Sequence, residues 1–129
     1  MTALQGKTAL VTGASAGIGL ATVRLLSHAG ARVICCARRL ERLQTQLDEL
    51  PGPGLAVVLD VADAVSAASL PDRLPQDWQA VDILVNNAGS DIGGRQPFHE
   101  GDINQWAGTI QTNVTGLMQV TAAMLPGML

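Results

Sequence analysis

Three glycines lie close together near the start of the chain, in the run Thr12-Gly-Ala-Ser-Ala-Gly-Ile-Gly19. Glycine lets the backbone turn tightly and lets a phosphate approach without a Cβ atom in the way. An apolar run, 8–11, precedes the glycines, and a segment suited to a helix, 18–27, follows them. The N-terminus of such a helix presents free N–H groups and a positive dipole end to an anion. In this setting the pattern favours a nucleotide-binding loop over a purely structural turn.

Two arginines at the end of a second apolar run indicate which nucleotide the loop would bind. A dinucleotide fold that prefers NAD has an acidic residue about 20 positions after the loop, where it binds the ribose 2′-hydroxyl. Here Arg38 and Arg39 stand in that region, and guanidinium groups bind a 2′-phosphate in bidentate fashion. A structural role at the start of the next helix explains them poorly, because cations are unfavourable at a helix N-terminus. The pair therefore favours NADP(H) over NAD(H).

Polar residues also follow two further apolar runs. Asp60 comes directly after the run 55–59, and Asn86-Asn-Ala-Gly89 comes after the run 81–85. Open parallel sheets bind ligands in the crevice outside the carboxyl ends of their strands. If the runs are strands of one sheet, Asp60, the asparagines and the glycine-rich loop are expected to lie together.

The elements that would position these residues alternate along the chain. Expected strands cover 8–11, 33–37, 55–59 and 81–85; expected helices cover 18–27, 40–50, 62–74 with an interruption at Pro71, and about 102–125 with Asn113 as a candidate break. Short apolar runs between amphipathic segments are the signature of βαβ units. Right-handed crossovers then predict a parallel sheet with helices on both faces. The 129 residues fit one domain.

Composition and charge exclude several classes of protein. The formal charge of −3 gives no basic footprint for nucleic acid or for an anionic membrane surface. No apolar run approaches the ~20 residues that span a bilayer, so a cytoplasmic protein is expected. The only two cysteines, Cys35 and Cys36, are adjacent. They lack the spacing of a zinc site, and on a strand they would point to opposite faces, so no metal site is expected.

Four motifs together resemble the short-chain dehydrogenase/reductase family, in order and at suitable intervals over the whole chain. They are the loop Thr12-Gly-x-x-x-Gly-Ile-Gly19, the pair Asp60-Val61, the run Asn86-Asn-Ala-Gly89, and Asn113. The resemblance implies an α/β fold, a Rossmann-type doubly wound parallel sheet with the strand order 3-2-1-4. Within the family, the segments 38–43, 82–89 and 125–128 are similar to NADP-dependent 3-hydroxy acid (serine-type) dehydrogenases.

The resemblance also implies a role for each matching residue. The loop would wrap the pyrophosphate, and the two arginines would hold the 2′-phosphate. Asp60 would bind the adenine amino group beside Val61, Asn87 would contact the ribose region, and Asn113 would help organise a proton-relay water. The implied cofactor-binding set is Thr12, Gly13, Ser15, Gly17, Ile18, Gly19, Arg38, Arg39, Asp60, Val61, Asn87, Ala88 and Gly89.

Catalysis in this family depends on a serine after the fifth strand and on a Tyr-x-x-x-Lys pair in the next helix. The 129 residues contain neither segment and no tyrosine at all. We therefore interpret residues 1–129 as the NADP-binding Rossmann portion of such a domain, truncated after the fourth strand and the helices that follow it. Its catalytic half would be absent.

Two interpretations of the function remain open. The resemblance implies an NADP(H)-dependent oxidoreductase that acts on a hydroxyl or carbonyl group of a small molecule, 3-hydroxy acids among the candidates. The complete enzyme would be a homo-oligomer. The alternative is a non-catalytic NADP(H)-binding module or scaffold.

Overall fold

The computed structural model describes residues 3–129. Its elements are β1 (Thr8–Thr12), α1 (Gly17–His28), β2 (Arg32–Ala37), α2 (Leu40–Leu47), β3 (Gly54–Val58), α3 (Ala64–Ala68), α4 (Leu70–Arg73), β4 (Ile83–Val85), α5 (Ile103–Ile110) and α6 (Gly116–Met128). Short 3₁₀ turns lie at Gln76–Trp78 and Phe98–Glu100, and a π-helical turn, Gln111–Thr115, joins α5 to α6.

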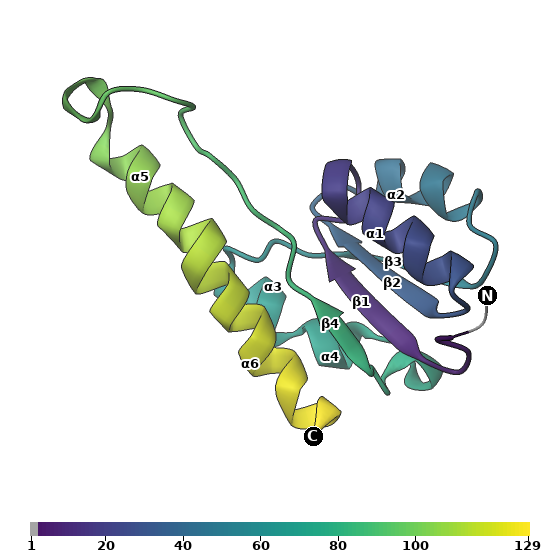
Figure 1. The fold of residues 1–129 in the computed structure, drawn as a ribbon. Coiled ribbons are helices and arrows are strands. Elements are labelled where there is room, and N and C mark those ends of the chain that lie inside the picture. The colour runs from purple at the N-terminus through teal and green to yellow at the C-terminus, as the bar shows by residue number, and fades with distance from the viewer. Residues whose placement is uncertain (1–2) are drawn as a thin grey trace.

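The four strands form one parallel sheet in the order β3-β2-β1-β4 (Figure 1). This confirms the predicted strand order 3-2-1-4. β1 lies between β2 and β4, and all of its side chains are buried. A strand that is covered on both faces has no polar side to expose, which explains the continuous apolar run from Ala9 to Val11.

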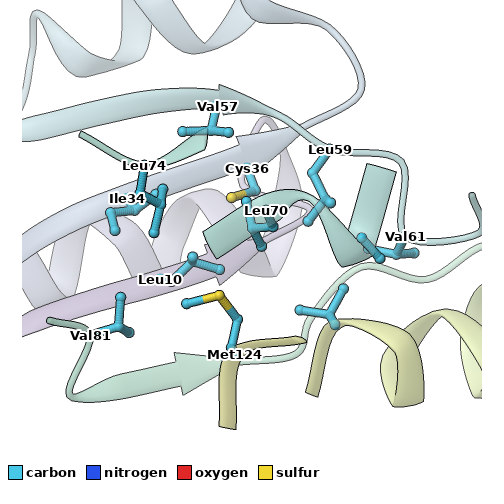
Figure 2. Packing of buried hydrophobic residues seen from close by; sticks show 12 residues of the cluster. Leu10, Ile34, Cys36, Val57, Leu59, Val61, Leu70, Leu74, Val81 and Met124 are labelled. Atoms are coloured by element: carbon cyan, nitrogen blue, oxygen red, sulfur yellow. The ribbon is translucent and has the colours of Figure 1, made fainter. Parts of the chain in front are cut away.

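Two hydrophobic clusters fill the two faces of the sheet. α1 and α2 cover one face, where Val23 and Leu43 are buried in a cluster with residues of β1 and β2. α3, α4 and α6 cover the other face (Figure 1), and there Leu70 and Met124 pack around Leu10 (Figure 2). The helices on both faces confirm the doubly wound arrangement.

The adjacent cysteines show how one strand serves both clusters. Cys35 belongs to the cluster beneath α1 and α2, whereas Cys36 belongs to the cluster on the opposite face. Successive side chains of a strand alternate between faces, so the expectation of opposite faces is confirmed. Burial raises the pKa of Cys35 to about 12. Burial also raises the pKa of Cys36, with a smaller contribution from the neighbouring Cys35.

Several helix boundaries differ from the predicted ones. The helix expected over 40–50 ends at Leu47, and tighter turns follow it. The helix expected over 62–74 begins at Ala64, because the Asp63 carboxylate accepts hydrogen bonds from two N–H groups of the first turn. Its interruption is confirmed, since a separate helix, α4, starts at Leu70 with Pro71 in its first turn. Proline is tolerated there because that N–H has no helical partner.

The last helical stretch is longer than the sequence predicts. It runs on through Pro126 to Met128, so the predicted end at Leu125 is wrong. Pro126 lies in the final turn and has no N–H to donate, so this turn has one backbone hydrogen bond fewer. The expected break near Asn113 takes the form of the π-helical turn, which widens the helix without ending it. Figure 1 shows α5 and the loop before it extending beyond the sheet.

Two kinds of feature are absent from residues 3–129. No helix of this part of the chain is long and apolar enough to cross a membrane. Within the same residues, no three histidine, cysteine, aspartate or glutamate side chains gather in a way that could hold a metal ion.

The buried thiols predict a specific dependence of stability on pH. An unfolded cysteine ionises near pH ~8.5, whereas the native state keeps both thiols protonated to a higher pH. The stabilisation is therefore full below about pH 8.5 and falls as the pH rises, by up to ~1.4 kcal/mol per pH unit for each thiol. Denaturant unfolding between about pH 8 and pH 10 measures this slope. A double variant, Cys35→Ala with Cys36→Ala, should show a shallower slope, and an equal slope would contradict the assignment.

Candidate functional site

A cavity of about 380 Å³ lies at the carboxyl ends of the strands. Segments that follow β1, β2, β3 and β4 all contribute to its wall, together with one residue of the π-helical turn. The lining residues are Gly13, Ser15, Ala16, Ala37, Arg38, Leu59, Asp60, Val61, Asn87, Ala88, Gly89, Ser90, Ile92 and Thr112. The structure therefore gathers the polar segments at the edge where the sequence analysis expected them.

The segments after β1 and β4 approach each other so closely that glycine is required between them. Gly13 has a φ of +61°, in the left-handed region, and a Cβ atom there would lie 2.9 Å from the Cα atom of Ala88. A Cβ atom on Gly19 would collide with the carbonyl oxygen of Gly13. The glycine pattern is thus explained by tertiary packing as well as by the turn itself.

Thr12 joins the same two segments from below. Its side chain is buried, and its hydroxyl accepts hydrogen bonds from the backbone N–H groups of Asn87 at 3.0 Å and Ala88 at 2.9 Å. The Asn87 amide in turn donates to the carbonyls of Thr12 and Gly13, both at 3.2 Å. Thr12 does not line the cavity, so its place in the structure is beneath the loop, where it holds the loop against the segment after β4.

The start of α1 is open to an anion. Ala16 occupies the N-cap position without a side-chain hydrogen bond, and the first turn of the helix contains no acidic residue. Ala16, Gly17 and Ile18 are all exposed. The first N–H groups of a helix have no partner within the helix, and no side chain of residues 3–129 caps them here. This end of the helix can therefore bind a phosphate group.

Arg38 and Arg39 stand at the edge of the cavity with exposed side chains. Arg38 lines the cavity, whereas Arg39 occupies the N-cap position of α2 and does not. Neither guanidinium forms an ion pair with any carboxylate in the described part of the chain. Two unpaired cations beside a polar cavity suit a doubly charged group such as a phosphate monoester.

A tight turn holds Asp60 and Val61 against α6. The Asp60 carboxylate accepts a hydrogen bond from the N–H of Ala62 at 3.1 Å, which closes an Asx turn. Gln119 of α6 donates its amide N–H to the carbonyl of Val61 at 2.7 Å. Gly116 lets the helix approach, since a Cβ atom there would lie 2.8 Å from a methyl carbon of Val61. Neither Gly116 nor Gln119 was predicted from the sequence.

Asn113 lies in the π-helical turn and bridges to the segment after β4. Its side-chain oxygen accepts a hydrogen bond from the N–H of Ser90 at 2.7 Å, and its amide donates to the Ser90 carbonyl at 2.8 Å. The side chain therefore holds the wall next to Gly89, and Asn113 itself does not line the cavity. The role in a proton-relay water stays a prediction.

The predicted residues divide into those that line the cavity and those that stand next to it. The lining ones are Gly13, Ser15, Arg38, Asp60, Val61, Asn87, Ala88 and Gly89, whereas Thr12, Gly17, Ile18, Gly19, Arg39 and Asn113 lie nearby. Six lining residues were not predicted from the sequence: Ala16, Ala37, Leu59, Ser90, Ile92 and Thr112. Five of them directly adjoin predicted positions, among them Thr112, which precedes Asn113. Ile92 has no local signal, because only the path of the loop after β4 brings it to the cavity.

Comparison with known proteins identifies the family of the chain. The family model described as short chain dehydrogenase matches residues 7–129. The chain belongs to the short-chain dehydrogenase family. Among curated members of this family, it is 43% identical over 125 residues to the "Probable NADP-dependent dehydrogenase" of Haemophilus influenzae, covering 97% of this chain and 49% of the relative. It is 42% identical over 119 residues to the "NADP-dependent 3-hydroxy acid dehydrogenase YdfG" of Escherichia coli K12, covering 92% and 48%.

Solved structures of the short-chain dehydrogenase family have the same fold. The closed form of a serine dehydrogenase complexed with NADP+ matches with a TM-score of 0.87 and 41% identity, over 94% of this chain and 48% of that one. The serine dehydrogenase of Escherichia coli matches with a TM-score of 0.86. The chain spans about half the length of the two curated relatives described above.

The buried Thr12 hydroxyl predicts a measurable contribution to stability. Thr12→Val keeps the shape of the side chain but leaves two N–H groups without their acceptor, so the free energy of unfolding should fall by about 2 kcal/mol. Thr22→Val is the matched control, because the hydroxyl of the half-buried Thr22 makes only a solvent-exposed hydrogen bond, to the carbonyl of Ile18; its effect should stay within about 0.5 kcal/mol. Urea unfolding of both variants measures the two free energies of unfolding. An equal decrease in the two variants would contradict the role given to Thr12.

Proposed function

We propose that the chain binds NADP(H) in the cavity at the carboxyl ends of the strands, as the cofactor-binding part of an NADP-dependent dehydrogenase. One observation carries the proposal. The cavity brings together a glycine-rich loop, the uncapped start of α1 and an unpaired arginine, Arg38. A dinucleotide with a pyrophosphate and a 2′-phosphate needs two anion-binding sites of this kind.

Each part of the cofactor has a suitable partner among the residues of the site. The loop from Gly13 to Ile18 and the first N–H groups of α1 would bind the pyrophosphate. Arg38, with Arg39 beside it, would bind the 2′-phosphate. Asp60 and Val61 would hold the adenine, and the segment from Asn87 to Gly89 would face the ribose on the nicotinamide side.

The reaction that we propose is the oxidation of a hydroxyl group, or the reduction of a carbonyl group, of a small molecule. When bound, the cofactor supplies or accepts the hydride. The names of the relatives support this reaction class, since they describe NADP-dependent dehydrogenases, among them a 3-hydroxy acid dehydrogenase and a serine dehydrogenase. A 3-hydroxy acid is therefore the first substrate class to test.

The general acid for this reaction cannot be a tyrosine of these residues, because the 129 residues contain none. As part of the proposal, residues 1–129 form the NADP-binding portion of the domain. The serine and the Tyr-x-x-x-Lys pair would come from chain outside this sequence. Asn113 would support catalysis by holding the segment that ends at Ser90.

A cytoplasmic location and a homo-oligomer belong to the same proposal.

The absence of tyrosine favours a second candidate for these residues taken alone, which is a module that binds NADP(H) without catalysis. An assay of the natural protein separates the two candidates. Formation of NADPH from NADP+ with a 3-hydroxy acid such as serine would support the dehydrogenase. Tight binding of NADPH without turnover of any hydroxyl or carbonyl compound would support the non-catalytic module.

The arginines predict a preference that calorimetric titration can measure. NADPH should bind more tightly than NADH, because charge-assisted hydrogen bonds to the 2′-phosphate are worth about 1.5–3 kcal/mol each. The double variant Arg38→Gln with Arg39→Gln should weaken NADPH binding by about 10- to 100-fold and leave NADH binding nearly unchanged. Arg95→Gln, an exposed arginine of the loop before α5, is the control. Equal affinity for the two cofactors in the unmodified protein would refute the preference.

A further inference from the structure

Gln46 places a polar side chain on the face of α2 that packs against the sheet. Residues three positions apart share a face of a helix, so Gln46 stands beside the buried Leu43. Its side-chain oxygen is buried and has no hydrogen-bond partner among residues 3–129. A buried, unpaired carbonyl oxygen is unfavourable. Packing alone therefore does not account for a glutamine here, because a leucine would fill the space without that cost.

The other end of the same amide group makes a hydrogen bond that reaches the glycine-rich loop. Its nitrogen donates to the main-chain carbonyl of Ser15 at 2.6 Å, across 31 residues of sequence. Ser15 lies between Gly13, with a φ of +61°, and Gly17, with a φ of +56°. Glycine leaves the backbone free to adopt many conformations. A loop flanked in this way needs contacts from outside to keep one shape.

Three successive residues of the loop receive such contacts from three different parts of the fold. The Gly13 carbonyl accepts from Asn87, which follows β4. The N–H of Ala14 donates to a carbonyl of β2. The Ser15 carbonyl accepts from Gln46 of α2. The Gln46 contact is the last one before the loop becomes exposed and α1 begins.

Holding the Ser15 carbonyl also orients the next N–H group. A peptide unit is planar and trans, so the carbonyl of Ser15 and the N–H of Ala16 point in opposite directions. The described chain contains no cis peptide bond. A carbonyl drawn towards α2 therefore turns the Ala16 N–H away from α2. Ala16 and Ser15 both line the cavity, so the orientation of this peptide bears directly on anion binding.

We propose that Gln46 is a positioning residue for the glycine-rich loop, and that it sets the Ser15–Ala16 peptide for binding the pyrophosphate of the dinucleotide. This inference rests on the proposed function and adds to it. α2 follows the two arginines directly. The same helix would thus connect the site for the 2′-phosphate with the loop that binds the pyrophosphate.

The test compares two identical substitutions on opposite faces of α2, made in the natural protein that carries this sequence. Gln46→Leu removes the hydrogen bond to the loop, whereas Gln44→Leu changes an exposed glutamine of the same helix. Gln46→Leu should raise the dissociation constant for NADPH about tenfold, as expected for one lost hydrogen bond, and that for NADH similarly. Binding of adenosine 2′,5′-bisphosphate, which lacks the pyrophosphate, should change by less than about threefold. Gln44→Leu should leave the dissociation constants for all three ligands unchanged.

The melting temperature distinguishes positioning from a merely structural role. Gln46→Leu should melt no lower than the unmodified protein, because it removes a buried unpaired oxygen. An unchanged dissociation constant for NADPH would overturn the inference. An equal rise in the dissociation constants for NADPH and for adenosine 2′,5′-bisphosphate, together with a lower melting temperature, would also overturn it. Gln46→Met, which keeps an unbranched side chain, replaces Gln46→Leu if the leucine does not fit.

Amide hydrogen exchange without ligand tests the inference independently of the proposed function. Gln46→Leu should speed exchange in the loop, residues 13–18, and leave exchange in β2 unchanged. If the unmodified protein binds no NADPH, the proposed function fails, and the exchange rates still decide whether Gln46 holds the loop. Unchanged exchange in the loop would overturn the inference even if NADPH binds.

Discussion

The close contact between the ends of β1 and β4 is the constraint on which the rest of the site depends. Two parallel neighbouring strands end at the same edge of the sheet, so the segments that follow them must share a small space. Gly13 makes that space available, and the Thr12 hydroxyl provides the acceptor for two N–H groups that follow β4. The glycine-rich loop keeps its place because Asn87 completes the same contact from the other side. A buried polar group without such a partner would destabilise the fold.

The opposite wall of the cavity is set by the helical stretch that contains α5 and α6. Gly116 brings this stretch against Val61, and Gln119 ties the two together through a hydrogen bond. In the π-helical turn that precedes α6, Asn113 holds Ser90 by both of its backbone groups. One helical stretch therefore positions the turn after β3 and the segment after β4 at the same time. The spacing between Asn113 and Gln119 along this stretch sets how far apart these two segments lie.

The residues around the cavity divide into a polar lining and a set of side chains that hold the lining in place. Arg38 and Asp60 face the cavity, whereas Thr12, Asn113 and Gln46 make their hydrogen bonds to backbone groups of the loops. The holding set is built from neutral hydroxyl and amide groups. Such groups satisfy loop backbone without adding charge, so the field at the site comes from the unpaired arginines, from the Asp60 carboxylate and from the start of α1.

By itself, the sequence determined those features of the protein that depend on neighbouring residues. The apolar runs predicted the strands to within about two residues, because a strand buried on both faces must be apolar throughout. The glycine pattern, the arginines after β2 and Asp60 after β3 could be assigned to one edge of the sheet, since the carboxyl ends of parallel strands meet there. Local chemistry was sufficient for each of these inferences.

Only the tertiary structure decided which distant residues complete the site. Ile92 follows β4 and Thr112 lies in the π-helical turn, and both line the cavity because the helical stretch returns alongside the loop after β4, where Thr109 of α5 accepts a hydrogen bond from the N–H of Ile92. In the sequence, Gln46 is indistinguishable from the other polar residues of an amphipathic helix. Its hydrogen bond to Ser15 forms because the packing of α2 on the sheet brings the side chain beside the loop. Such contacts join residues that lie 17 to 76 positions apart. Strand order and helix packing set these distances, and the local sequence does not record them.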